Sequence, residues 1–210
     1  MSTITAVELV QRLGDIALDR IRLSPVPGTA TVEDVTEIHD REGVLCELID
    51  GVLVEKVRGF LESGLGIFLA TMLDAFVRAR NLGIVTGMDG TFEVMPHLVR
   101  IPDVAFTSWD RLPGRCYPTA PIPALAPNLV VEVLSHSNTR GEMALKRQDY
   151  FAAGVELVWE VDPPSRTIAV YTSLTTIRTL RIADVLDGGT VLPNFAVAVG
   201  EVFAELDRRG

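Results

Sequence analysis

The spacing of apolar residues in the first half of the chain predicts a hairpin followed by a long helix. Residues 44–56 (VLCELIDGVLVEK) place β-forming residues on both sides of Asp50-Gly51, a dipeptide that suits the positive φ angles of a tight turn. In residues 60–80 apolar side chains recur every three or four positions, which is the period of one helix face. Residues 81–83 (NLG) are then typical of a helix end.

The second half predicts a strand, a helix and a further strand in close succession. Residues 129–135 (LVVEVLS) form an apolar strand, a helix capped by Ser137 or Asn138 should reach Ala153, and residues 155–161 form the next strand. Such a unit predicts the α/β class, with a mixed sheet flanked by helices. The other expected elements are a helix at 4–13, a turn-rich stretch at 22–31, strands at 84–86, 91–95, 100–107 and 166–172, a Pro-rich loop at 113–127, and a last strand and short helix within 192–206.

Length and composition favour one folded domain. The chain has 210 residues, of which 48% are apolar and 22% charged, so it has enough apolar surface for a packed core. We expect an N-terminal helix and loop segment at 1–43 and an α/β domain at 44–210.

The chain shows no secretory pattern at its N-terminus, and charged residues break each apolar run before the roughly 20 residues of a membrane span. We therefore expect a cytoplasmic protein that does not enter the membrane, with Cys46 and Cys116 as reduced thiols. A net charge of −9 argues against non-specific coating of nucleic acid, although an enzyme with one local basic face remains compatible with it.

Three acidic residues interrupt strands that are otherwise apolar: Glu47, Asp103 and Glu132. An ionised carboxylate in such a strand costs free energy unless it meets a cation, a hydrogen-bond network or a metal ion. Three converging acids would suit a hard cation such as Mg²⁺, which prefers one or two carboxylates together with water and substrate phosphate. The alternative is that each acid points to solvent from a half-exposed strand.

Lys146 provides a cation on the helix that follows the Glu132 strand. Its ordinary alternative is a surface lysine paired with Glu142, which would contribute a few tenths of a kcal/mol. Tyr150, one turn further, could face the same site, although a tyrosine there more often packs in the core. Neither a serine-hydrolase elbow nor a phosphate loop occurs in the sequence.

Four motifs resemble those of the Uma-two family of restriction-endonuclease-like proteins, which belongs to the PD-(D/E)XK nuclease superfamily. The motifs are CELIDGVLVE (46–55), IPDVAF (101–106), PNLVVEVLS (127–135), and Lys146 with Tyr150 and AGVELVWEVDP (153–163). The resemblance runs from about residue 44 to the C-terminus. It implies a restriction-endonuclease-like fold with an N-terminal hairpin.

The resemblance also implies roles for individual residues. Asp103 and Glu132 would be the metal ligands, Glu47 the additional acid of the hairpin, and Lys146 the catalytic lysine. The superfamily lysine usually sits two positions after the glutamate, where this chain has Leu134, so the role would move to the following helix. Family members often carry a histidine early in the first long helix, and residues 57–63 contain none.

The leading hypothesis is therefore a DNA endonuclease that depends on Mg²⁺ or Mn²⁺ and hydrolyses phosphodiester bonds, acting as a homodimer. One alternative is a catalytically silent binding or regulatory module with the same fold, and another is a small-molecule phosphohydrolase.

Two expectations follow from this site. Glu47, Asp103, Glu132 and Lys146 should converge on one polar cleft. If Asp103 and Glu132 repel each other without metal, at least one of them should have a raised pKa, and Asp103→Asn should leave stability unchanged or slightly higher. A carboxylate that satisfies buried partners would behave in the opposite way.

Overall fold

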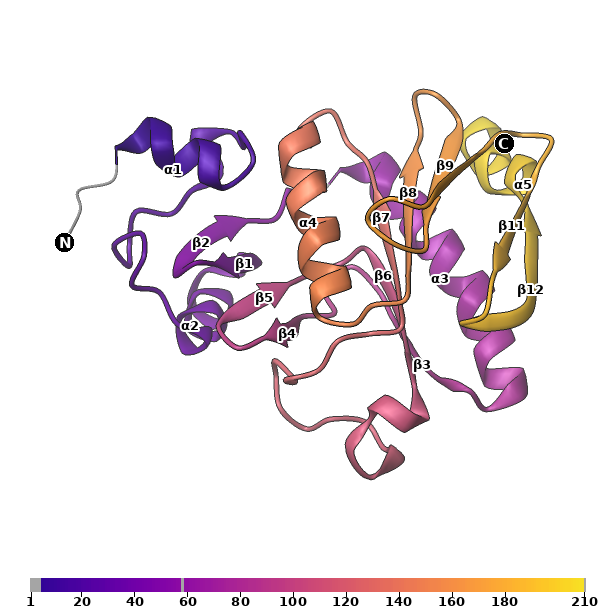
Figure 1. Ribbon diagram of the computed structural model, residues 1–210, viewed down its shortest axis with the longest axis horizontal. Helices are drawn as coiled ribbons and strands as arrows, with labels where there is room; N and C mark the ends of the chain where they lie inside the picture. The colour runs from indigo at the N-terminus through magenta and orange to yellow at the C-terminus, as the bar shows by residue number, and fades with distance from the viewer. Residues whose placement is uncertain (1–4, 58, 210) are drawn as a thin grey trace.

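The computed structural model describes residues 5–57 and 59–209, and a six-stranded mixed sheet forms its centre (Figure 1). The strand order is β10-β9-β8-β7-β6-β3. β7 (Leu129–Val133) and β8 (Leu157–Asp162) are parallel, and α4 (Arg140–Ala152) connects them, which confirms the predicted strand-helix-strand unit. The remaining pairs are antiparallel and involve β3 (Gly83–Thr86), β6 (Val104–Ser108), β9 (Thr167–Tyr171) and β10 (Ile177–Leu180).

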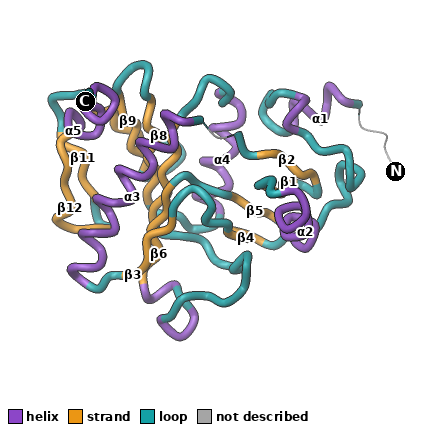
Figure 2. Tube along the Cα trace, turned by 180° about the vertical axis from the view of Figure 1, so that it is seen from behind, coloured by secondary structure: helices purple, strands orange, loops and turns teal. Residues whose placement is uncertain are grey.

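Helices cover both faces of this sheet. α3 (Phe60–Arg80) packs on the face seen in Figure 2, and α4 lies on the face seen in Figure 1. Because successive residues of a strand point to opposite faces, residues 129, 131 and 133 of β7 join the core under α3. Val130 packs with Tyr150 of α4, and Glu132 points to that same side. The strand pleat thus turns the one acid of β7 toward α4.

The predicted hairpin belongs to a second, four-stranded antiparallel sheet of order β2-β1-β5-β4. β1 (Cys46–Ile49) and β2 (Val52–Glu55) meet at Asp50 and Gly51, whose φ angles of 50° and 71° are those of the expected tight turn. β4 (Phe92–Met95) and β5 (Leu98–Arg100) complete the sheet, which lies beside α4 in Figure 1. α2 (Val32–Glu42), which was not predicted, packs against it through Val35 and Ile38.

The expected strand at 100–107 is present only in part: β6 covers residues 104–108, and the chain bends at 101–103 between β5 and β6. Pro102 has no backbone N–H to give to a sheet, and the backbone N–H of Asp103 donates to Val131 O at 3.1 Å. The bend carries the chain from the small sheet to the central sheet. Asp103 therefore lies at the junction of the two sheets.

Other boundaries differ by a few residues from the predicted ones. α1 (Ala6–Arg12) matches the first predicted helix, whereas α4 is capped by Thr139 and not by Ser137 or Asn138. The last predicted strand and helix are present as β12 (Leu192–Ala198) and α5 (Val199–Ala204), and β12 pairs with an unpredicted β11 (Val185–Gly188). Short 3-10 turns occur at Leu18–Arg20, Trp109–Arg111, Pro113–Arg115 and Glu205–Asp207.

The expectation that no apolar run approaches the length of a membrane span is wrong for α3. The helix has 21 residues, and an 18-residue window within it has a mean hydropathy of 1.6, so it is long and apolar enough to cross a bilayer by length and composition alone. That window holds no more than two charged residues. One stripe of α3, including Leu69 and Leu73, is buried on the central sheet as in a core helix, while the outward-facing Ile67 is exposed. The absence of a membrane partner remains a prediction.

Candidate active site

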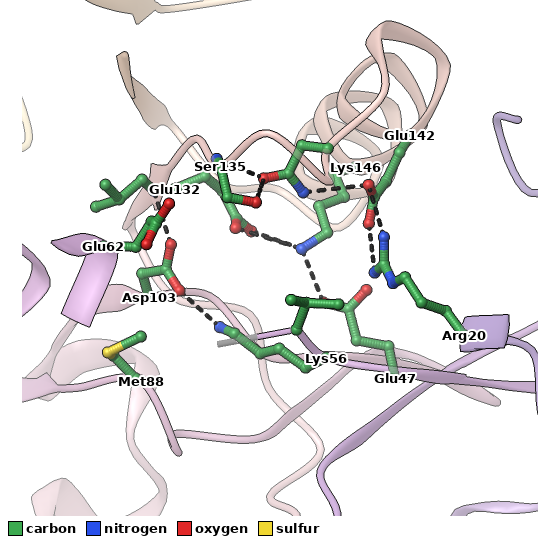
Figure 3. Close-up of a pocket in the computed structure, with 13 residues that line it drawn as sticks. Arg20, Glu47, Lys56, Glu62, Met88, Asp103, Glu132, Ser135, Glu142 and Lys146 are labelled. Atoms are coloured by element: carbon green, nitrogen blue, oxygen red, sulfur yellow. Dashed lines mark hydrogen bonds and ion pairs between the residues drawn. The ribbon is translucent and has the colours of Figure 1, made fainter. Parts of the chain in front are cut away.

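The structure brings the four predicted site residues together around one small pocket (Figure 3). Glu47, Asp103, Glu132 and Lys146 are all buried and all line this space of about 30 Å³, which we name the acidic pocket. The space is large enough for one or two water molecules. The other charged residues that line the acidic pocket are Arg20, Lys56, Glu62 and Glu142.

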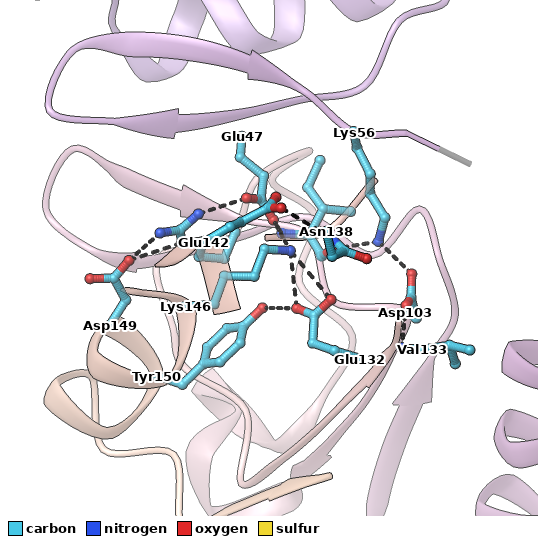
Figure 4. Close-up of polar contacts among 12 residues, drawn as sticks. Glu47, Lys56, Asp103, Glu132, Val133, Asn138, Glu142, Lys146, Asp149 and Tyr150 are labelled. Atoms are coloured by element: carbon cyan, nitrogen blue, oxygen red, sulfur yellow. Dashed lines mark hydrogen bonds and ion pairs between the residues drawn. The ribbon is translucent and has the colours of Figure 1, made fainter. Parts of the chain in front are cut away.

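Glu132 faces the acidic pocket because the pleat of β7 turns it toward α4. Its carboxylate accepts a hydrogen bond from Tyr150 Oη at 2.5 Å and lies 3.2 and 3.3 Å from Lys146 Nζ (Figure 4). Burial raises the pKa of Glu132 to about 7; the Lys146 ammonium opposes this shift and the Asp103 carboxylate adds to it. The pKa of Glu132 is thus raised, as expected for one member of the acid pair, but burial is the largest cause and repulsion by Asp103 is a smaller one.

Glu47 extends from β1 and receives two cations and a backbone donor. Arg100 Nη1 lies 2.7 Å from Glu47 Oε2, and Lys146 Nζ lies 3.0 Å from Glu47 Oε1. The backbone N–H of Ile101 donates to Oε1 at 3.1 Å. Although burial favours the neutral acid, Lys146 and Arg100 hold the pKa of Glu47 well below its usual value. Arg100 also pairs with Asp149 of α4, so the hairpin sheet and α4 are tied together through buried charges.

Lys146 lies between the two glutamates. Burial would lower the pKa of this lysine, but Glu132 and Glu47 raise it above its usual value, so the ammonium stays charged. The alternative of a surface pair with Glu142 is excluded, because Glu142 instead pairs with Arg20 at 2.7 Å.

Asp103 is held by the bend between β5 and β6. Its Oδ2 accepts a hydrogen bond from the backbone N–H of Val133 at 2.7 Å, and its Oδ1 lies 2.8 Å from Lys56 Nζ. Lys56 was not predicted to belong to the site. It follows directly after β2, and its ammonium also donates to Ile101 O at 2.5 Å.

Arg20 is a second cation that was missed. Its guanidinium donates to Glu142 in a bidentate pair at 2.7 and 3.0 Å, and its Nε donates to Glu55 O at 3.0 Å. Arg20 thus joins β2, which precedes Lys56, to α4, which carries Lys146. Nothing in the local pattern around Arg20 predicts these contacts, because its partners lie 35 and 122 residues away.

The acidic pocket offers suitable donors for a divalent metal ion. Within 5–57 and 59–209, no group of three His, Cys, Asp or Glu side chains converges closely enough to hold one. Asp103 and Glu132 nevertheless line the same pocket with carboxylate oxygens, and Mg²⁺ commonly uses only one or two carboxylates plus water and substrate phosphate. Asp103 Oδ1 and Ile101 O both contact the Lys56 ammonium, so two oxygens already face one positive charge at this position, as they would face a metal ion.

Comparison with known proteins gives the family. Residues 32–200 match a family described as "Uma2: Putative restriction endonuclease". The chain belongs to the Uma2 family. A solved structure described as a putative nuclease belonging to DUF820, from Anabaena variabilis, is similar with a TM-score of 0.68 and 15% sequence identity, over 77% of this chain and 91% of that chain. The likeness shows the restriction-endonuclease-like fold. No curated protein matches the chain.

The matched range contains all four predicted site residues and Lys56, whereas Arg20 lies outside it. The acidic pocket of this Uma2 protein thus combines residues of the family region with one from the preceding segment.

Proposed function

We propose that this Uma2 protein is a cytoplasmic DNA endonuclease that depends on Mg²⁺ or Mn²⁺ and hydrolyses phosphodiester bonds. The observation that carries the proposal is that Asp103, in the bend before β6, and Glu132, on β7, line one pocket with Lys146. Two acids and a lysine are the residue types that metal-assisted phosphodiester cleavage needs. The family assignment supports the same class of activity.

Asp103 and Glu132 would hold the ion, which when bound would polarise a phosphoryl oxygen and lower the pKa of a water molecule. Lys146 keeps its positive charge beside Glu132, where it can stabilise negative charge that develops on the phosphate. Glu47 is a positioning residue, because it fixes the Lys146 ammonium and the Arg100 guanidinium at opposite oxygens. Tyr150 orients the Glu132 carboxylate through its hydroxyl group.

A plasmid-nicking assay with Mg²⁺, Mn²⁺ or EDTA tests the proposal. Wild type should nick supercoiled DNA only with metal, and Asp103→Ala and Lys146→Met should lose this activity. Asp74→Asn is the matched control, since Asp74 forms an exposed pair with Arg78 on α3. Cleavage that persists in Asp103→Ala at the wild-type rate would remove Asp103 from the site.

One observation favours the second candidate, a catalytically silent nuclease-fold module. Each buried acid of the acidic pocket already has a cationic partner from the protein itself: Glu47 and Glu132 pair with Lys146, Asp103 with Lys56, and Glu142 with Arg20. Under this reading the protein would bind DNA in a gel-shift assay without cleaving it at any metal concentration. Hydrolysis of bis(p-nitrophenyl) phosphate without DNA cleavage would instead favour a small-molecule phosphohydrolase.

A further inference from the structure

The two lysines of this protein both lie in the acidic pocket. The sequence contains Lys56 and Lys146 and no other lysine, although it contains 19 lysines and arginines in total. An ammonium is a compact charge that donates in three directions, whereas a guanidinium is a flat fork suited to bidentate pairs. The protein therefore uses ammonium groups only where several oxygens converge on a small space.

We propose that the Lys56 ammonium occupies a cation position on Asp103, so that a divalent ion must displace Lys56 in order to bind Asp103. This inference rests on the proposed metal-dependent function. It assigns to Lys56 the role of a competitor for the metal, distinct from the role proposed for Lys146.

The contacts of Asp103 support this assignment. Oδ2 is engaged by the backbone N–H of Val133 at 2.7 Å, and Oδ1 faces Lys56 Nζ at 2.8 Å. The same Nζ lies 2.5 Å from Ile101 O, so a carboxylate oxygen and a carbonyl oxygen both point at one positive charge. These are the donor types that Mg²⁺ takes in proteins. An ion on Oδ1 would meet the Lys56 ammonium at close range and in a buried site, where like charges repel strongly.

Lys56 can leave more easily than Lys146. Among the residues that the structure describes, Lys146 contacts two carboxylates and extends from the middle of α4, whereas Lys56 contacts one carboxylate and follows the end of β2. In the metal-free protein Lys56 neutralises Asp103, and the acidic pocket can then fold without metal. The same contact weakens metal binding.

Calorimetric titration with Mn²⁺ tests the competition without any measurement of activity. Lys56→Met and Lys56→Gln should bind Mn²⁺ at least tenfold more tightly than wild type, because the competing charge is gone. Arg78→Met is the control for net charge, since Arg78 is exposed on α3 and pairs with Asp74 away from the acidic pocket; it should match wild type. Circular dichroism establishes that each variant is folded.

A second measurement uses the unmodified protein. The side chains of Lys56 and Lys146 are only 7% and 5% exposed, and these are the only lysine amines in the chain. Acetylation followed by mass spectrometry should show that Mn²⁺ increases labelling of Lys56 severalfold relative to EDTA, with Lys146 changing less.

The outcomes separate this inference from the proposed function. Equal Mn²⁺ affinity in wild type and both folded Lys56 variants would overturn the competition and leave the metal site standing. Absence of binding in all of them would overturn the metal site and the competition together. If neither variant folds, the labelling experiment on the unmodified protein decides. When Mn²⁺ binds the protein but acetylation of Lys56 is unchanged or reduced, the inference is overturned.

Discussion

Asp103→Asn should destabilise the metal-free protein, which reverses the expectation drawn from sequence. The Asp103 carboxylate is buried, accepts a hydrogen bond from the Val133 N–H and pairs with Lys56 Nζ. Asparagine can keep the first contact through its carbonyl oxygen. It leaves the Lys56 ammonium buried without a counter-ion. The cost of this unpaired charge is larger than the gain from removing the repulsion between Asp103 and Glu132.

The size of the effect follows from these contacts. Removing one partner of a buried ion pair costs about 3–5 kcal/mol. Two features reduce this cost here: Lys56 still donates to Ile101 O, and the loss of Asp103 removes a charge that raises the pKa of Glu132. We therefore expect the free energy of unfolding to fall by about 2 kcal/mol, which lowers Tm by roughly 4–8 °C in a chain of this size.

Urea and thermal unfolding in EDTA measure this loss. Asp74→Asn makes the same substitution in an exposed pair and should cost no more than about 0.5 kcal/mol. The double variant Asp103→Asn with Lys56→Met should recover part of the loss, because no ammonium is then left unpaired. Added Mg²⁺ should raise the Tm of wild type but not that of Asp103→Asn. An Asp103→Asn protein as stable as wild type in EDTA would refute the buried-pair reasoning.

Three further outcomes are expected. In EDTA, the free energy of unfolding should fall by up to about 3 kcal/mol as the pH rises from about 4.5 to 7. The reason is that folded Glu132, with its pKa near 7, retains a proton that the unfolded chain has released. Urea titrations at stepped pH should show a flatter slope for Glu132→Gln than for wild type. Arg20→Met should cost about 3 kcal/mol, since it leaves Glu142 buried without its cation, and Arg20→Met with Glu142→Gln should cost less than the sum of the two single changes. Light scattering should show a homodimer, the simplest assembly for cutting both strands with one site per chain, and a strict monomer at working concentrations would contradict it.

Elements with strong local signals could be predicted from the sequence. The hairpin follows from Asp50-Gly51 between β-forming residues, and α3 follows from its apolar period and from Asn81 at its end. The bend at 101–103 could not be predicted in the same way, because the apolar run around it is also that of a continuous strand. What ends β5 is a change of sheet, which depends on where β1 and β7 lie.

The acidic members of the site could be predicted because burial of a lone carboxylate is costly, and an acid inside an apolar strand therefore indicates a partner. Which residue pairs with a given acid depends on the tertiary fold. Glu142 lies four residues before Lys146 and would pair with it in an isolated helix, yet in the protein it meets Arg20 from 122 residues away. Lys146 therefore pairs with Glu47 and Glu132 instead.

Lysine usage is the sequence signal that could have led to Lys56. In a chain this rich in arginine, selection of lysine at two positions indicates that an ammonium is needed there, because arginine would otherwise serve equally well in an exposed pair. In the structure, Arg20 and Arg166 each meet one carboxylate with two separate N–H groups, whereas the single nitrogen of each lysine contacts oxygens from two different residues. Composition alone cannot say which acid each lysine meets, since that depends on the hairpin reaching the bend at Asp103. A residue type used only twice, in the same pocket, is better explained by the chemistry of that pocket than by the general solubility of the chain.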